Sequence, residues 1–417
     1  MTVKGTVSAM AFRFVHAADL HLDTPFARIG AVPPELREAV RDASLAAFDG
    51  LVDLAIARQA AFVVLAGHSY DGIACGLRAQ LRLRAGLERL VAQGIRAVIA
   101  LAGDERPSDW SAVPGWPDGV RVLGGGVRSV PIERDGERLA TLHGGSGGDD
   151  PLQGFRREPA GGLHVGVLHC PPGGRLCVVD ALAARGMDYW ALGGAHGRRV
   201  LSAAPWIAFA GTPQGRGFQE AELGPKGALV LSVDGRALQP PEFVPLDRVR
   251  LLRLEADVSD VPDLAALSAG LIERAEAARL EHRGRVLLLR ATLTGTGPLH
   301  GELLRPRALD DLLRELRGSA RAAGEPVWWD AVEDRTRSAR DPAELARRGD
   351  LTAELIGLSR ELAADPARLR AMADERFAPL RRAIPGNAMA LDEAALAELL
   401  DDATALAIDL MEEMDRP

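Results

Sequence analysis

Lysine is almost absent from this sequence. It occurs only at Lys4 and Lys226, so nearly all of the positive charge is arginine. The formal net charge is -8, and residues 387–417 carry nine acidic side chains and one basic one (1 - 9 = -8), so the rest of the chain is about neutral. A neutral body gives no independent evidence for nucleic-acid binding. Arginine clusters can still bind phosphate locally, because the guanidinium group forms bidentate pairs with it.

Cysteine is also scarce, and long apolar runs are missing. The three cysteines, Cys75, Cys170 and Cys177, have no spacing typical of a metal site or a disulfide. No apolar run reaches the roughly eighteen residues of a membrane span, and the start of the chain has no apolar block of signal-peptide length. We therefore expect no disulfide, no transmembrane helix and no membrane partner, and we place the protein in the reducing cytoplasm.

The first part of the chain alternates apolar runs with stretches of helical spacing. Continuous apolar runs at 12–18, 61–66 and 95–101 are typical of strands buried on both faces of a sheet. Helical apolar spacing covers 33–59 and 76–93 between them. This order predicts an α/β layered fold, in which functional residues gather at the carboxyl ends of the strands.

The next part of the chain predicts a second sheet. Short strands with glycine-rich turns occupy 120–144, and apolar runs follow at 163–169, 187–196, 204–210 and 227–233. We expect this sheet to pack on the first, with helices outside. A chain of 417 residues can form two or three domains. We assign the two-sheet α/β sandwich to residues 1–240, and a small α/β capping domain that contacts substrate or DNA to residues 246–338.

Residues 341–417 are predicted to form a helical tail. The last helix, at 391–414, has an apolar stripe formed by Leu396, Leu399, Ala403, Leu406, Leu410 and Met414. Such a stripe either packs on its own domain or docks a helix of a partner, and the sequence leaves both interpretations open.

Residues of metal-ligand type follow the predicted strands. Asp19 and His21 come directly after the first apolar run. Two residues apart in an extended segment, they share one face, and their groups suit manganese, iron or zinc. In the alternative interpretation, Asp19 caps the following turn and His21 is a hydrogen-bonded loop histidine. Further residues of this type follow the later strands, which favours a metal site: His68, Asp104, Glu105, His169 and His196.

Five strand-end motifs occur in order along the chain: Asp19-Leu-His21, Gly67-His68, Gly103-Asp104-Glu105-Arg106, His169 and Gly193-Gly194-Ala195-His196. Their order and spacing resemble those of the calcineurin-like metallophosphoesterases. The strings at 15–23, 188–193, 213–218 and 224–227 are similar to the SbcD/YhaO branch, bacterial relatives of a DNA-repair nuclease that works beside an SMC-like ATPase. The resemblance covers about residues 12–250 closely and the following module loosely.

The resemblance implies a divalent metal, with manganese first and iron or zinc as alternatives. One metal would be held by Asp19, His21, His68 and His196, where His68 replaces a carboxylate of the family. The second site would keep only Asp104 and His169, with Glu105 as a possible third ligand. A neutral imidazole has one free lone pair, so His68 cannot bridge two cations as a carboxylate does. Gly194 stands where the family has a histidine ligand, so the second site is expected to be weak or absent.

Glu105 stands where the family has a catalytic histidine that protonates the leaving group. A glutamate needs a pKa raised towards neutrality for this role, and the neighbouring Arg106 would lower it. The resemblance thus implies metal-dependent hydrolysis of phosphodiester bonds in DNA, weakened by the lost second-metal ligands. The alternatives are a catalytically inactive DNA-binding or scaffold subunit of an SMC-like ATPase complex, and a phosphoesterase acting on small molecules.

Three arginines near the last motif are candidate contacts to phosphate or DNA: Arg198, Arg199 and Arg216. In the alternative interpretation they are solvated surface residues. The expected partners are DNA and an SMC-like ATPase subunit that binds the C-terminal helices, and assembly as a homodimer stays open.

Overall fold

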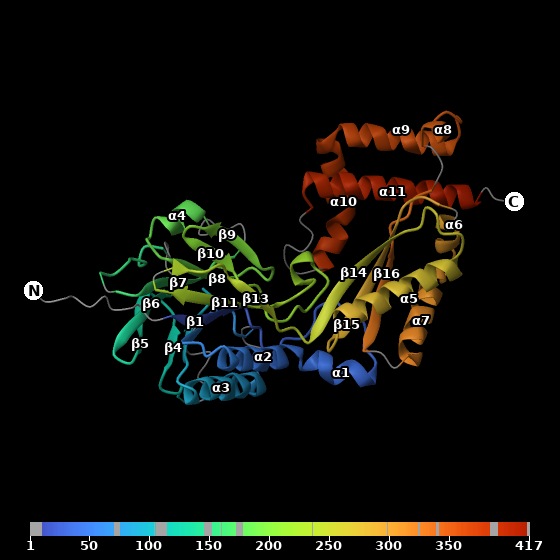
Figure 1. Cartoon of the computed structure of the whole chain (residues 1–417). Coiled ribbons are helices and arrows are strands. Elements are labelled where there is room, and N and C mark those ends of the chain that lie inside the picture. Colours follow the sequence, from blue (N-terminus) through green and yellow to red (C-terminus); the bar gives the residue numbers. More distant parts are fainter. Residues whose placement is uncertain are drawn as a thin grey trace, which may run out of the picture. The chain divides into compact units, whose positions relative to one another are not determined.

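The computed structural model describes residues 11–70, 76–103, 105, 115–145, 152–159, 161–171, 178–235, 237–297, 299–323, 326–338, 342–383 and 391–414. The chain forms two compact units, whose elements are labelled in Figure 1. One unit comprises Met1–Leu254, Ile272–Arg290 and Leu316–Ala331. The other comprises Glu255–Leu271, Ala291–Glu315 and Val332–Pro417.

The first sheet lies in the first unit and has the strand order β12-β11-β1-β2-β3-β4, with β13 also paired to β11. Its strands are β1 (Phe12–Ala18), β2 (Phe62–Ala66), β3 (Arg96–Ala100), β4 (Val120–Leu123), β11 (Gly227–Asp234), β12 (Ala237–Leu238) and β13 (Glu242–Pro245). Strands β1 to β4 run parallel, and Ala18, Ala66 and Ala100 are in register. Because these strands end at one level, the residues that follow them emerge at one edge of the sheet.

Helices cover the outer face of this sheet. The segment expected to be a single helix at 33–59 is two helices, α1 (Pro34–Arg41) and α2 (Ala43–Ala57). They are interrupted at Asp42, whose φ of -94° and ψ of 2° are not helical and whose carboxylate accepts a hydrogen bond from Arg41. Helix α3 (Leu77–Ala92) follows β2. Apolar side chains of α2 and α3 share a buried core with β1, β2 and β3.

The second sheet has the order β5-β6-β7-β8-β10-β9. Its strands are β5 (Arg128–Arg134), β6 (Glu137–Gly144), β7 (Leu163–His169), β8 (Tyr189–Gly193), β9 (Arg199–Ala203) and β10 (Trp206–Phe209), with helix α4 (Val179–Ala183) between β7 and β8. Strands β6, β7 and β8 are parallel, and His169 is in register with Gly193. The loops after β7 and β8 therefore begin at one level as well.

The two sheets share a core between them. The Phe14 ring of β1 stacks on Phe62 of β2 with ring centroids 4.7 Å apart. On its other side it meets Tyr189 of the second sheet edge-on at 5.6 Å. The predicted two-sheet α/β sandwich flanked by helices is confirmed.

The remaining elements are a third sheet and a helical tail. The third sheet, β14-β15-β16, contributes residues to both compact units. Its strands and helices are β14 (Val249–Asp257), α5 (Leu264–Glu281), β15 (Val286–Thr294), α6 (His300–Leu303), α7 (Ala308–Ala322) and β16 (Val327–Asp334). The tail contains α8 (Pro342–Leu345), α9 (Leu351–Ala364), α10 (Pro366–Ala383) and α11 (Glu393–Met414). The compact units do not follow the domain limits 1–240, 246–338 and 341–417, which remain a prediction.

The cysteine expectation needs a correction. Cys170 directly follows β7, is fully buried and is disulfide-bonded. The expectation that the cysteines form no disulfide is therefore wrong, because spacing along a sequence does not report which thiols the fold brings together. Cys75 and Cys177 lie outside the described residues.

No helix among the described residues combines the length and the apolar character needed to cross a membrane.

Candidate metal centre

The loops after β1 and β2 run side by side beyond the ends of their strands. The backbone N of Asp19 donates to the Ala66 carbonyl at 3.1 Å, and the N of His21 donates to the His68 carbonyl at 3.2 Å. Parallel pairing thus continues past the sheet edge, and it brings the first two motifs of the sequence together.

The first of these loops has an unusual backbone. Asp19, His21 and Asp23 have φ values of 47°, 43° and 60°, in the left-handed region that non-glycine residues rarely adopt. Each such residue costs on the order of 1–3 kcal/mol and persists where its surroundings hold it in place. Such strain is common at functional sites, and here it falls on two of the predicted metal ligands.

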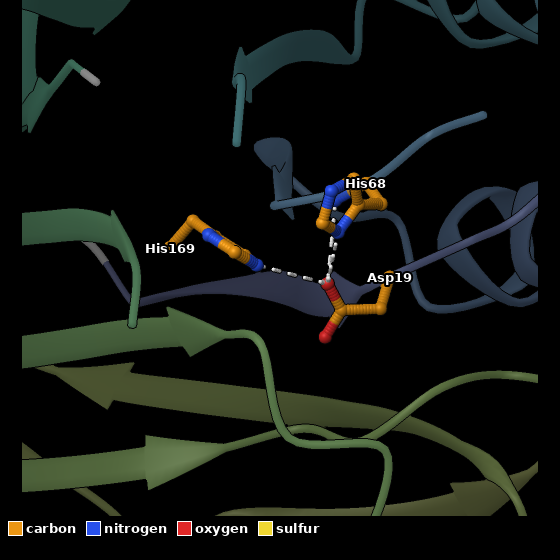
Figure 2. Close-up of side chains that lie close together, drawn as sticks. All are labelled: Asp19, His68 and His169. Carbon is orange, nitrogen blue, oxygen red and sulfur yellow. Dashed lines mark hydrogen bonds and ion pairs between the residues drawn. The ribbon is translucent and has the colours of Figure 1, made fainter. Parts of the chain in front are cut away.

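Asp19 lies at the centre of the site and is fully buried. Its Oδ1 accepts a hydrogen bond from the backbone N of His68 at 3.3 Å, and its Oδ2 accepts one from the N of Gly194 at 2.6 Å. Figure 2 shows the imidazoles of His68 and His169 directed towards Oδ1, with His68 Nδ1 and His169 Nε2 each 4.0 Å away. Two atoms that each lie about 2.1 Å from one cation can be at most about 4.2 Å apart. Both distances fall within that limit.

Asp19, His68 and His169 form a group whose candidate ligand atoms all lie within 4.8 Å of one another. The sequence placed His169 in the second site, whereas the structure places it beside the carboxylate of the first. The close approach depends on Gly67, which has a φ of +88°. A Cβ there would lie 2.4 Å from Asp19 Oδ1 and 2.8 Å from the His169 ring.

The other two predicted ligands of the first site contact each other. His21 Nε2 lies 3.1 Å from His196 Nε2, and the His21 ring stacks on His68 with centroids 5.3 Å apart. The structure therefore brings His21, His68 and His196 together. Whether all of them share one cation with Asp19 remains a prediction.

An acid that the sequence reasoning missed supports this pair. Glu222, in the short 3-10 helix Glu220–Glu222, is hydrogen-bonded to His196 Nδ1 through Oε1. Its Oε2 accepts a hydrogen bond from the backbone N of Arg216 at 2.9 Å. Burial raises the pKa of Glu222, but His196 and Arg216 outweigh burial and hold it below its usual value. The sequence offered one indication of a role for Glu222: it lies between the strings at 213–218 and 224–227, which resemble the family.

Glu105 is buried beside the second loop. Its Oε2 accepts a hydrogen bond from the N of Ala102 at 2.9 Å, and its Oε1 accepts one from the N of Ser69 at 3.3 Å. Burial raises the pKa of Glu105 to about 7, against these hydrogen bonds and the charge of His68. The net shift is upward, because removing a carboxylate from water outweighs the groups that stabilise its charge. The expected lowering by Arg106 stays a prediction. Arg106 lies outside the described residues.

The candidate phosphate-binding arginines have other contacts. The Arg198 guanidinium lies over the Phe243 ring at 4.6 Å from its centroid. Arg199 is exposed at the start of β9, and Arg216 contributes its backbone N to Glu222. A role for these three arginines with phosphate stays a prediction. Asp104, the other predicted ligand of the second site, lies outside the described residues.

The donor set fits a divalent cation. A buried carboxylate needs compensating charge, and among the described residues no lysine or arginine pairs with Asp19. Imidazoles and carboxylates together suit manganese, iron and zinc. The described residues thus provide a candidate site with a carboxylate and surrounding imidazoles, to which Gly194 contributes its backbone N–H.

Comparisons with known proteins agree with this chemistry. Residues 252–337 match the family described as "Metallophosphoesterase YhaO, middle domain". The "Uncharacterized metallophosphoesterase YhaO" of Bacillus subtilis (strain 168) is 29% identical over 373 residues, which cover 83% of this chain and 90% of that protein. The crystal structure of TT1561 of Thermus thermophilus is 12% identical, covers 55% of this chain and 98% of that one, and has a TM-score of 0.31, which is too low to support an inference about this chain.

Proposed function

Because the chain is similar to the metallophosphoesterases, we propose that it hydrolyses phosphodiester bonds in DNA with one firmly held divalent cation. The observation that carries the proposal is the buried Asp19 carboxylate with the imidazoles of His68 and His169 directed at it. Manganese is the first metal to test, with iron and zinc as alternatives.

A bound cation would polarise a phosphoryl oxygen and lower the pKa of a bound water. The chain's own residues prepare the place for this chemistry. Asp19 is held by backbone amides on both of its oxygens, so its carboxylate needs no reorientation to bind. His21 and His196 present nitrogens 3.1 Å apart, a separation that suits neighbouring ligands of one cation. Glu105 remains the candidate proton donor, because it occupies the position of the family's catalytic acid.

Activity is expected to be weak. A two-metal site stabilises the attacking and the leaving oxygen together. In this chain His68 replaces a bridging carboxylate, and Gly194 supplies no side chain. A single cation leaves part of the developing charge unsupported, so we expect slow turnover.

The second candidate is a scaffold subunit that binds an SMC-like ATPase through the tail. Within α11, Leu396 packs with Leu369 and Ala373, and Ile408 packs with another apolar cluster of the tail. By contrast, Leu399, Leu406 and Leu410 have 39%, 51% and 51% of their surface exposed. Together with Ala403 they follow the 4-3-4 spacing of a coiled-coil seam. This exposed seam supports docking of a partner helix.

The enzyme proposal is tested by metal content and cleavage. We expect about one tightly bound manganese per chain, slow manganese-dependent cleavage of DNA, and loss of both in Asp19→Asn. A chain that retains much less than one manganese at neutral pH contradicts the enzyme proposal. Cleavage of a chromogenic phosphodiester without cleavage of DNA would indicate a small-molecule phosphoesterase instead.

The scaffold proposal is tested with Leu406→Glu and Leu410→Glu. We expect both to abolish capture of an SMC-like ATPase coiled coil without changing the thermal midpoint. Leu358→Glu is the matched control, because Leu358 is 47% exposed on α9. Equal binding by all three variants would exclude the seam on α11.

A further inference from the structure

We propose that Glu222 is a positioning residue of the metal centre: its carboxylate holds the proton of His196 on Nδ1 and so leaves Nε2 free to bind the cation. This inference rests on the proposed function, because it concerns the same site. It assigns a role to a residue outside all five strand-end motifs.

The chemistry of Glu222 and His196 decides which of the two donates the hydrogen bond between them. An ionised carboxylate can only accept, so the nitrogen of His196 that meets Glu222 Oε1 must be the donor. A neutral imidazole protonated on Nδ1 carries its lone pair on Nε2. That atom faces His21 Nε2 at 3.1 Å, inside the predicted ligand set. The carboxylate thus selects the tautomer that can bind a metal.

Glu222 is itself held in place. It is 7% exposed, and its second oxygen is occupied by the backbone N of Arg216. Lys226 Nζ donates to the carbonyls of Ala221 and, at 3.2 Å, of His196. One of the two lysines in the sequence therefore joins the backbone beside Glu222 to the backbone of the histidine that Glu222 orients.

These contacts explain why the segment 213–227 lies at the site. It contacts the ring nitrogen of His196 that does not face His21, and it holds the ring before a cation arrives. Carboxylate partners of metal-binding histidines typically change metal affinity by about 10- to 100-fold when they are removed. We expect an effect of this size.

The most informative variant is Glu222→Gln, which keeps the size of the side chain. Its amide group can donate to Nδ1 and would move the proton of His196 to Nε2, the nitrogen needed by the metal. We expect manganese affinity to fall by about 10- to 100-fold, with partial recovery in Glu222→Asp. Glu220→Gln is the matched control, because Glu220 lies in the same short helix and is exposed. Its affinity should not change.

A second measurement reads the proton directly. Nitrogen-15 NMR of the metal-free protein should show His196 protonated on Nδ1 in the wild type and shifted to Nε2 in Glu222→Gln. A wild-type His196 protonated on Nε2 overturns the inference, and so does unchanged manganese affinity in a folded Glu222→Gln. If Glu222→Gln does not fold, the spectrum of the wild type still shows which nitrogen of His196 carries the proton. If the wild type binds no manganese, the proposed function fails while the spectrum still tests the tautomer.

Discussion

The backbone N of Gly194 donates a 2.6 Å hydrogen bond to Oδ2 of Asp19. Gly194 stands at the position where the family resemblance implies a histidine ligand, and it contacts Asp19 through its backbone N–H. Gly194 has a φ of +105°, and a Cβ there would lie 2.8 Å from the carbonyl carbon and oxygen of Cys170. A side chain at position 194 would therefore clash with the backbone of Cys170, which opposes the introduction of a histidine there.

Gly194→Ala tests this relationship. We expect a loss of about 2–3 kcal/mol in the free energy of unfolding, because the backbone conformation and the clash with Cys170 both oppose a side chain. Manganese affinity should fall with it, since Asp19 loses a fixed donor. Urea unfolding and manganese titration measure the two effects. Gly197→Ala is the control from the same loop: its Cβ would meet nothing closer than 3.8 Å, so both quantities should stay near wild type.

His68→Asp tests the other departure from the family. An aspartate can bridge two cations, whereas a neutral imidazole cannot. With Asp19 and His169 close by, we expect manganese stoichiometry to rise above one per chain and phosphodiesterase activity to increase several-fold. The gain should stop short of a complete two-metal site, because Gly194 still supplies no ligand. Unchanged stoichiometry by elemental analysis would show that the replaced carboxylate is not what limits metal binding.

Gln214 joins the string at 213–218 to the start of β14. Its amide donates to the carbonyl of Val249 at 2.6 Å and to that of Gly215 at 2.8 Å, and its Oε1 accepts from the backbone N of Arg248 at 2.9 Å. Gln214→Leu leaves these buried groups without a partner, so we expect a loss of about 2–4 kcal/mol by urea unfolding. Gln219→Leu, at an exposed position nearby, should change stability by less than about 0.5 kcal/mol.

His16 is expected to contribute a loss of stability on acidification, whereas Glu105, whose pKa burial raises to about 7, acts in the opposite direction. Burial lowers the pKa of His16 from 6.5 to about 3 in the folded protein, where its Nδ1 meets the Tyr189 hydroxyl at 2.8 Å. Between these two values the unfolded chain binds a proton that the folded chain does not, so stability is complete above pH 6.5 and is lost as the pH falls. Titration of one such group changes the free energy of unfolding by up to about 1.4 kcal/mol per pH unit.

His16→Gln should reduce the difference between the free energies of unfolding that urea titrations give at about pH 5 and at about pH 7. Some slope should remain, because burial beside His164 also lowers the pKa of His143, to about 4. An unchanged slope in the variant would mean that His16 is already protonated in the folded state or that its unfolded pKa is not ordinary.

The strands of the two sheets, and the polar residues at their ends, could be predicted from the sequence. The runs at 12–18, 61–66 and 163–169 correspond to β1, β2 and β7, because short continuous apolar segments suit strands that are buried on both faces of a sheet. Asp19, His68, His169 and His196 were candidates because each follows such a strand. The break at Asp42 was not predicted, because the apolar spacing continues across it and does not report backbone angles.

Local sequence thus determined which segments became strands, and with them which polar residues would lie at the sheet edge. Only the tertiary structure decided how those residues combine: His169 beside Asp19, Glu222 behind His196, and the backbone N of Gly194 bound to Oδ2 of Asp19. The physical reason is that periodicity reports burial along one segment. Distances between loops, left-handed backbone angles and the desolvation of Glu105 depend on segments far apart in the chain packing against one another.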